Sequence, residues 1–219
     1  FYIQIIKFPS IFKIFGNISY IDKEDLDSAL KIMSKTYKKS PKYINPYYKI
    51  TNHPDNTNKV GIATVCSLTI DGILVNNGIL STPKYGGLIE VGNPPLFVEM
   101  ISYNGSSIDP HKIFIFKNMT NVDMKKIGSQ NVLASIKEVP YITRDKSKEI
   151  LSKIMDIGLS IYKIGKPREL VYNAKVDNYN FGVVAGSGLN SIAAIKENNI
   201  DIEVKAAEKL IQFSELEKI

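Results

Sequence analysis

The sequence predicts an α+β protein made of two similar units, and three observations lead to this prediction. Residues 60–79 align without gaps with residues 181–200, at an offset of 121 residues. Both segments have the same order, namely an apolar strand, a turn of small polar residues and an amphipathic helix. In addition, 44% of the residues are hydrophobic and 23% are charged, which is typical of a globular chain with a sizeable core.

Identical residues support this alignment at four positions, and the same register continues on both sides of it. The identical pairs are Gly61 with Gly182, Leu68 with Leu189, Asn77 with Asn198 and Ile79 with Ile200. "SYID" (19–22) aligns with "PYIT" (140–143) at the same offset, and "KIM" (31–33) aligns with "KIM" (153–155) at an offset of 122. We therefore expect an internal duplication. The alternative is a pair of unrelated strand–turn–helix units.

The first unit is expected to contain six elements in the order β-α-β-β-α-β. These are a strand at 12–20, a helix at 23–39, a weak strand at 47–51, a strand at 61–67, a helix at 69–78 and a strand at 86–91, with a polar loop at 52–59.

The second unit is expected to repeat this order. Its helix at 143–162 has Thr143 as a candidate N-cap and an apolar face that includes Ile150 and Ile154. The other elements are strands at 131–139, 169–174, 181–186 and 208–216, a turn at 176–180 and a helix at 190–199.

This order is typical of ferredoxin-like units (the α-β plait), in which helices cover one face of a sheet. We expect the first ferredoxin-like unit over residues 1–92 and the second over residues 131–219. The segment 93–130 connects them, with an extra strand at 96–103 and a short helix or strand at 109–116.

Composition and charge exclude several classes of protein. The single cysteine, Cys66, excludes an intramolecular disulfide and favours a reducing compartment, so a cytoplasmic location is expected. No apolar run approaches the 18 or so residues needed to cross a bilayer, and no leader peptide is visible, so no membrane partner is expected. The net charge is +6, but the lysines are scattered or lie on helix faces ("KTYKKSPK", "RDKSKE"), mixed with acids, and no arginine-rich run occurs, which favours a solvated surface over a nucleic-acid surface.

Each unit places a turn of small polar residues between its third strand and its second helix. The first turn holds Cys66, Ser67, Thr69 and Asp71, and the second holds Gly186, Ser187, Gly188, Asn190 and Ser191. Thr69 and Asn190 align with each other, and both residue types favour the N-cap position. A helix start attracts carboxylate or phosphate, and glycine allows close approach of a backbone. Either the two turns hold the two ends of one dianion, or both are capped turns without a ligand.

Other chemistries have little support in the sequence. His53 and His111 have no partner at metal-ligand spacing, so no metal site is expected. No histidine lies near Cys66 in the sequence, so a cysteine nucleophile is the weaker interpretation of that residue. "GSGLN" lacks the lysine of a Walker A loop and the third glycine of a dinucleotide fingerprint. We expect no catalytic residues, no cofactor and no enzymatic activity.

Several segments together resemble the regulatory domain of NrpR-type archaeal nitrogen repressors. They are "VGIATVCSLTIDGILVNNGI", "YGGLIEV", "SYNGSSIDPHKIFI", "VLASIKEVP" and "FGVVAGSGLNSIAAIKENNI", and the resemblance extends from about residue 15 to residue 215. One departure is Ser191, where the family commonly has a proline after "GLN".

The resemblance implies a regulatory domain of a transcriptional repressor of nitrogen-assimilation genes, with 2-oxoglutarate as the inducing effector. The effector site carried over from it consists of Cys66, Ser67, Thr69 and Asp71 on one side and Gly186, Gly188 and Asn190 on the other.

The resemblance also implies a homodimer that reaches operator DNA through a winged helix-turn-helix. That element is absent from this chain, so we expect either an effector module separated from its repressor or a form that works through a partner. Two alternatives from other classes remain. One is a ligand-free dimerisation or protein-interaction module, and the other is a small-molecule enzyme that depends on Cys66.

Overall fold

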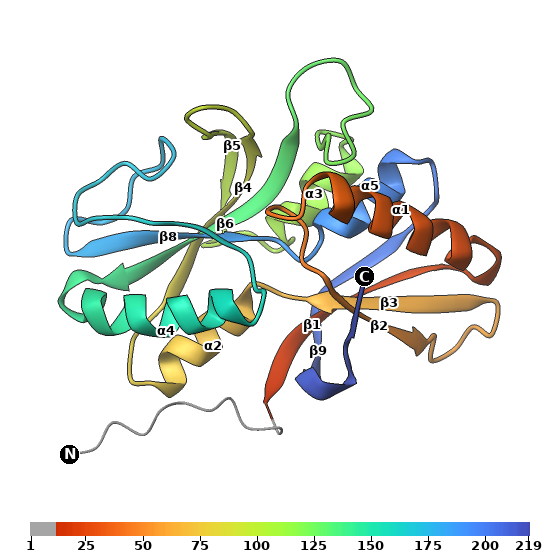
Figure 1. The fold of residues 1–219 in the computed structure, drawn as a ribbon, viewed down its shortest axis with the longest axis horizontal. Helices are drawn as coiled ribbons and strands as arrows, with labels where there is room; N and C mark the ends of the chain where they lie inside the picture. Colours follow the sequence, from red (N-terminus) through yellow and green to blue (C-terminus); the bar gives the residue numbers. More distant parts are fainter. Residues whose placement is uncertain (1–11) are drawn as a thin grey trace.

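The computed structural model describes residues 12–219, which form two five-stranded antiparallel sheets and five α-helices (Figure 1). The prediction of an α+β fold is confirmed. The first sheet has the order β10-β2-β3-β1-β9, with β1 (Lys13–Asp22), β2 (Tyr47–Asn52), β3 (Lys59–Val65), β9 (Glu203–Gln212) and β10 (Glu217–Lys218). The second has the order β5-β4-β6-β8-β7, with β4 (Thr82–Glu90), β5 (Leu96–Ser102), β6 (Asn131–Pro140), β7 (Ile161–Ile164) and β8 (Asn180–Gly186).

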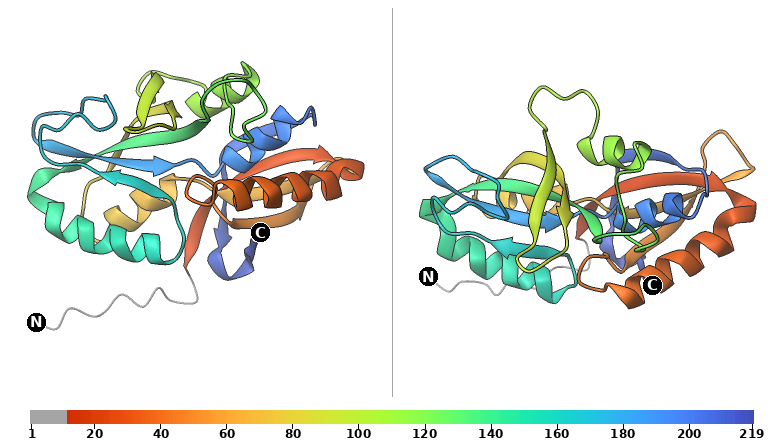
Figure 2. Two further views of the ribbon diagram at one scale, coloured as in Figure 1. Left: turned by 45° about the horizontal axis from the view of Figure 1, so that its top comes forward. Right: turned by 90° about the horizontal axis from the view of Figure 1, so that it is seen from above.

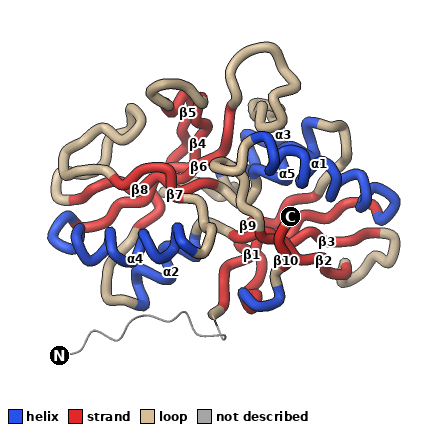
Figure 3. The backbone as a smooth tube through the Cα atoms, viewed as in Figure 1, coloured by secondary structure: helices blue, strands red, loops and turns tan. Residues whose placement is uncertain are grey.

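The helices form two groups, one beside each sheet (Figure 3). Their bounds are α1 (Leu26–Lys39), α2 (Leu68–Asn76), α3 (Pro110–Phe116), α4 (Arg144–Asp156) and α5 (Asn190–Glu197). Helix α1 contacts α5 near the first sheet, and α2 contacts α4 near the second sheet; Figure 2 shows the same grouping from two further sides. Two clusters of buried apolar residues form the core between these layers.

The two halves of the chain exchange their last strands. Strand β4 does not pair with β1 but with β6, and β9, at the end of the chain, pairs with β1. The helices that precede these strands are exchanged as well, since α2 packs with α4 and α5 packs with α1. The division of the chain at residues 92 and 130 and the duplication itself stay predictions, but strand pairing crosses both of these boundaries.

Most of the expected elements are present, and three expectations in the second half are wrong. The helix expected at 143–162 ends at Asp156, because Gly158 has a φ of +90°, the left-handed conformation in which helices commonly end. The next strand is therefore β7, whereas the strand expected at 169–174 is a tight turn closed by Val171 and Ala174. The last long strand, expected at 208–216, is β9 and ends at Gln212.

The connecting segment contains the expected extra strand, β5, at one edge of the second sheet. Residues 109–116, left open between helix and strand, contain the helix α3. Asp109 starts it by accepting hydrogen bonds from the backbone N–H groups of His111 and Lys112, and Pro110 occupies its first turn. Within residues 12–219, no helix is both long enough and apolar enough to span a bilayer.

Candidate functional site

Two short segments, which we name the crossovers, carry the chain from one sheet to the helices beside the other sheet. The first crossover is residues 66–67, between β3 and α2, and the second is residues 187–189, between β8 and α5. The crossovers are the polar turns singled out in the sequence. The second crossover packs against the end of β3, where the first crossover begins, because a Cβ atom added to Gly188 would lie 1.9 Å from the carbonyl oxygen of Val65. Glycine is therefore required where the two chain segments cross.

Each crossover is fixed to the first strand of its own half, and in the first half this strand is β1. The backbone N–H of Cys66 donates to the carbonyl of Phe15 at 2.7 Å, and the Thr69 hydroxyl accepts from the N–H of Phe15 at 3.0 Å. The expectation that Thr69 caps α2 is wrong. Ser67 holds the N-cap position, but its side chain makes no capping hydrogen bond to α2, and the buried Thr69 binds the backbone of Phe15 in β1 instead.

The second half repeats this arrangement at β6. The N–H of Ser187 donates to the carbonyl of Leu133 at 3.1 Å, and the Asn190 Oδ1 accepts from the N–H of Leu133 at 2.7 Å. Asn190 is therefore equivalent to Thr69 as expected, but it does not cap α5 either, since Leu189 holds the N-cap position. The two turns resemble each other because both bind the backbone of the first strand in their own half of the chain.

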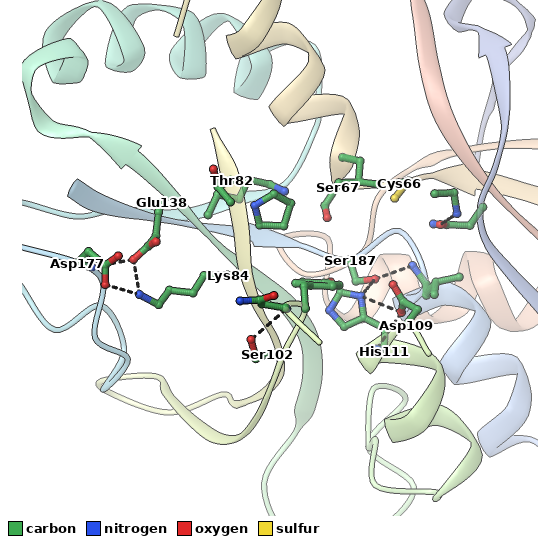
Figure 4. Close-up of a pocket in the computed structure, with 18 residues that line it drawn as sticks. Cys66, Ser67, Thr82, Lys84, Ser102, Asp109, His111, Glu138, Asp177 and Ser187 are labelled. Carbon is green, nitrogen blue, oxygen red and sulfur yellow. Dashed lines mark hydrogen bonds and ion pairs between the residues drawn. The ribbon is translucent and has the colours of Figure 1, made fainter. Parts of the chain in front are cut away.

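A cavity of about 620 Å³ lies beside the crossovers (Figure 4). Both crossovers, β4, β6 and the segment between β5 and α3 contribute to its wall. The lining residues are Asn17, Cys66, Ser67, Leu68, Thr82, Pro83, Lys84, Ser102, Tyr103, Asn104, Asp109, His111, Lys137, Glu138, Asp177, Ser187, Leu189 and Ala207. The connecting segment, which the sequence presented as a linker, is thus part of the wall.

A buried ion pair lies next to the cavity. The Lys137 ammonium, which is fully buried, donates to Asp71 Oδ2, and Asp71 Oδ1 accepts from the Ser81 hydroxyl at 2.6 Å. A buried lysine requires such a partner, because an uncompensated charge is costly in a medium of low polarity. The Asp71 carboxylate is therefore occupied by residues of the protein itself.

His111 links the cavity wall to β6 and to the second crossover. Its Nε2 lies 3.0 Å from the carbonyl oxygen of Ala134, which requires an N–H donor there, so Nδ1 accepts from the Ser187 hydroxyl at 3.1 Å. Burial lowers the pKa of His111, which keeps the ring neutral. Within residues 12–219, no group of three His, Cys, Asp or Glu side chains could hold a metal ion.

Lys84 is the cation at the outer part of the cavity. Its ammonium donates to Glu138 at 2.5 Å and to Asp177 at 2.8 Å (Figure 4). Partial burial acts to lower the pKa of Lys84, but the hydrogen bonds and charges of the two acids outweigh it and raise the pKa. Lys84 therefore stays charged, and it fastens the loop that carries Asp177 to β4 and β6.

Cys66 lines the cavity, but its surroundings do not activate it. Burial raises the pKa of the Cys66 thiol to about 11, although a hydrogen bond from the Leu68 backbone and the charge of Lys137 act in the opposite direction. A cysteine nucleophile needs a pKa lowered towards neutrality. The raised pKa of Cys66 therefore counts against the enzyme alternative.

We expect alkylation of Cys66 by iodoacetamide to be slow at pH 8, roughly 100-fold slower than alkylation of a cysteine in an unfolded peptide, because only the thiolate reacts. The rate should rise about tenfold per pH unit up to about pH 11. Mass spectrometry of samples quenched at intervals measures this rate. Rapid alkylation at pH 7 that levels off below pH 9 would contradict the raised pKa.

The seven residues expected at the effector site lie within one region of the fold, but in different settings. Cys66 and Ser67 line the cavity. The other five lie behind its wall: Thr69 and Asn190 bind strand backbones, Asp71 binds Lys137, Gly186 packs against Tyr162, and Gly188 packs against Val65.

Sequence reasoning missed several residues of the cavity, above all Lys84, Lys137 and Tyr103. One signal was present for Lys137, since a lysine inside the apolar strand "VLASIKEV" must find a buried partner. Lys84 and Tyr103 had no comparable signal, because the sequence does not show that β4 and the connecting segment meet β6.

Comparisons with known proteins agree with this architecture. Residues 12–218 match the family model described as NrpR regulatory domains NRD1 and 2. The chain is 36% identical over 201 residues to the global nitrogen regulator NrpR of Methanocaldococcus jannaschii, covering 91% of this chain and 34% of that protein. It is 32% identical over 212 residues to the global nitrogen regulator NrpRI of Methanosarcina mazei, covering 93% of this chain and 65% of that protein.

A solved structure shows the same fold. The crystal structure of a nitrogen repressor-like protein from Methanococcus jannaschii matches with a TM-score of 0.80 and 32% identity, covering 94% of this chain and 88% of the other. The chain spans about a third of the first regulator and just under two thirds of the second. The matched family comprises regulatory domains, so the prediction that the chain is not an enzyme is confirmed. The crossed two-sheet fold and the match over residues 12–218 together show that this chain belongs to the NrpR regulatory domain family.

Proposed function

We propose that this chain is the effector-sensing domain of a transcriptional repressor of nitrogen-assimilation genes, that it binds 2-oxoglutarate as the inducer and that it takes part in dimerisation. One structural observation supports the proposal beyond family membership, namely the cavity of about 620 Å³ at the crossovers. Its volume is in the range of small-molecule sites. Because both halves of the chain contribute to its wall, a bound dicarboxylate contacts both and favours one relative arrangement of them.

Hydrogen-bond donors in the wall support binding of carboxylate and keto oxygens. The Ser67 hydroxyl accepts from Ser135 at 3.1 Å, so its own O–H is available to a ligand. Burial raises the pKa of Tyr103 well above its ordinary value, so the phenol keeps its proton and can donate. In this proposal, Cys66 and Ser67 contact the effector, and Thr69, Asp71, Gly186, Gly188 and Asn190 hold the wall in place.

In this proposal, the ammonium group of Lys84 binds the second carboxylate of 2-oxoglutarate. Lys84 is shared between Glu138 and Asp177, so a ligand carboxylate competes with these two acids for its charge. Asp177 is the acid that yields, because its side chain is 71% exposed whereas that of Glu138 is 11% exposed. Displacement of the Asp177 side chain removes the ion pair that ties the loop between β7 and β8 to β4, while the Asp177 N–H still donates to Glu138 on β6 at 2.7 Å, so binding is coupled to the position of this loop.

We expect 2-oxoglutarate to raise the thermal unfolding midpoint of this chain selectively, with succinate and glutamate as control ligands. At 100 times the dissociation constant, the stabilisation should be about 2.7 kcal/mol. Asp177→Asn should increase the affinity roughly fivefold because the competing charge is removed, and Lys84→Met should lower it by at least as much. Isothermal titration calorimetry measures both changes.

The matched control is Asp201→Asn, since Asp201 is also an exposed acid paired with a lysine, Lys196, at 2.7 Å, but it does not line the cavity. Its affinity for 2-oxoglutarate should equal that of the wild type. Thr69→Ala and Asn190→Ala are unsuitable as tests of binding, because each removes a hydrogen bond that holds a strand. A ligand response that is equal for all three dicarboxylates, or absent, would contradict effector sensing.

An absent response would favour the alternative of a ligand-free dimerisation module. The surface that supports dimerisation is the edge strand β5, on which Leu96, Val98 and Met100 alternate as exposed apolar side chains. An edge strand of this kind is a pairing surface.

A further inference from the structure

Helix α1 presents a row of lysines to solvent. Lys31, Lys35 and Lys38 are exposed, and their spacing of four and three residues places them on one line along the helix. Lys39 lies beside this line. The small Ser34 lies between the lysines, so that their side chains frame a shallow, open depression on the outside of the molecule. The right-hand view of Figure 2 shows α1 at the outer edge of the molecule.

These charges have few partners within the protein. Lys39 pairs with Asp123 at 2.9 Å, but Lys31, Lys35 and Lys38 form no ion pair with any residue in 12–219. Asp27 is the one acid in α1, against four lysines, which gives the helix a net charge of +3. Half of the net charge of the chain, +6, therefore lies on one helix of 14 residues.

Comparison with helix α4 shows that this concentration of positive charge is a property of α1. It carries four cations as well, but three acids alternate with them along the 13-residue helix. One of these acids, Glu149, pairs with Lys153 at 2.7 Å. A helix with alternating charges is a solvated surface, whereas Lys31, Lys35 and Lys38 of α1 have no ion-pair partner among the described residues, and only Lys39 beside them is paired, with Asp123.

The absence of exposed apolar side chains from the lysine row indicates which class of partner it binds. None of the large hydrophobic residues of α1 is exposed, and Leu26, Leu30 and Tyr37 pack against the core. Protein interfaces generally have an apolar centre, which this surface lacks. Lysines without an apolar centre are typical of contacts with nucleic-acid phosphates.

We propose that the row formed by Lys31, Lys35, Lys38 and Lys39 contacts the phosphate backbone of double-stranded DNA. This inference rests on the proposed function insofar as a repressor domain is held close to DNA. From Lys31 to Lys39 the helix rises about 12 Å, a length of duplex that carries about seven phosphate charges. The contact is independent of base sequence and adds to the affinity of a separate DNA-reading element.

The test uses the whole chain and a fluorescent duplex of about 20 base pairs in anisotropy titrations at several salt concentrations. We expect a dissociation constant of roughly 10–100 μM at low salt, in the range of sequence-independent binding. The variant Lys31→Gln/Lys35→Gln/Lys38→Gln should bind at least tenfold more weakly. The slope of log K against log salt should become less steep by about 2.7, or about 0.9 for each cation removed.

The control variant is Lys146→Gln/Lys148→Gln/Lys153→Gln, which removes the same charge from α4 and should bind within twofold of the wild type. Equal weakening in both variants would attribute binding to net charge alone and overturn the proposal. Displacement of the duplex by polyglutamate at equal charge concentration would instead indicate an acidic protein as the partner and also overturn it.

A thermal shift with 2-oxoglutarate on the same proteins separates this inference from the proposed effector function. Loss of DNA binding in the α1 variant with an unchanged response to 2-oxoglutarate supports both. DNA binding through α1 in a chain that does not respond to 2-oxoglutarate supports the DNA contact and contradicts effector sensing. A wild-type chain that responds to 2-oxoglutarate but does not bind the duplex overturns the DNA contact alone.

Discussion

Gly188→Ala is expected to lower the free energy of unfolding by about 3 kcal/mol or more, at or beyond the upper end of what overpacking usually costs. The new Cβ would lie 1.9 Å from the carbonyl oxygen of Val65, and this neighbour is backbone in a central strand, which cannot rotate away. The clash would push the second crossover away from the end of β3. Urea unfolding followed by circular dichroism measures the change.

The matched control is Gly92→Ala, because a Cβ at Gly92 would meet its nearest atom, the carbonyl oxygen of Pro94, at an ordinary distance of 3.5 Å. This variant should unfold within about 0.5 kcal/mol of the wild type. Equal stability of the two variants would mean that Gly188 does not make this close contact with the backbone of Val65.

Lys137→Met is expected to cost about 3–5 kcal/mol, because it leaves the Asp71 carboxylate buried without its counter-charge. The double variant Lys137→Met/Asp71→Asn should recover most of this loss. The amide oxygen introduced by Asp71→Asn still accepts from the Ser81 hydroxyl, and no uncompensated charge remains. A double-mutant cycle in urea gives the coupling between the two sites.

The control for this cycle is the exposed pair of Lys153 with Glu149, for which Lys153→Met should change stability by no more than about 0.5 kcal/mol. If the effects of Lys137→Met and Asp71→Asn simply add, the two side chains do not act as a buried pair. The cost of each would then reflect packing alone.

The sequence predicted local structure well wherever the pattern of apolar residues is itself local. The strands β1, β3, β6 and β8 and the helices α1, α2 and α5 agree with expectation, as does the aligned pair of polar turns. The exchange of last strands could not be predicted. The residues of β4, "TPKYGGLIE", carry no alternation that would distinguish β1 from β6 as its partner.

At the candidate site, too, the local features could be predicted from the sequence and the long-range contacts could not. The sequence identified the turns at Cys66 and Gly188 and the equivalence of Thr69 with Asn190, but their tasks depend on what lies opposite. Thr69 faces the backbone of Phe15, which lies 54 residues away, and Asn190 faces that of Leu133, which lies 57 residues away. Propensity favours an N-cap at both positions, and tertiary contacts take precedence over it.

The pairing of β1 with β9 also determines when the first sheet can fold during synthesis on the ribosome. Lys13 lies opposite Gln212, so one of the first described residues can pair only after one of the last described residues has been synthesised. While β4 emerges, β1 still has an open edge beside β3, and β6, the partner of β4, has not yet been made. The first sheet therefore closes only when nearly the whole of this chain is available, and its folding is expected to be slow, as for other folds dominated by distant contacts.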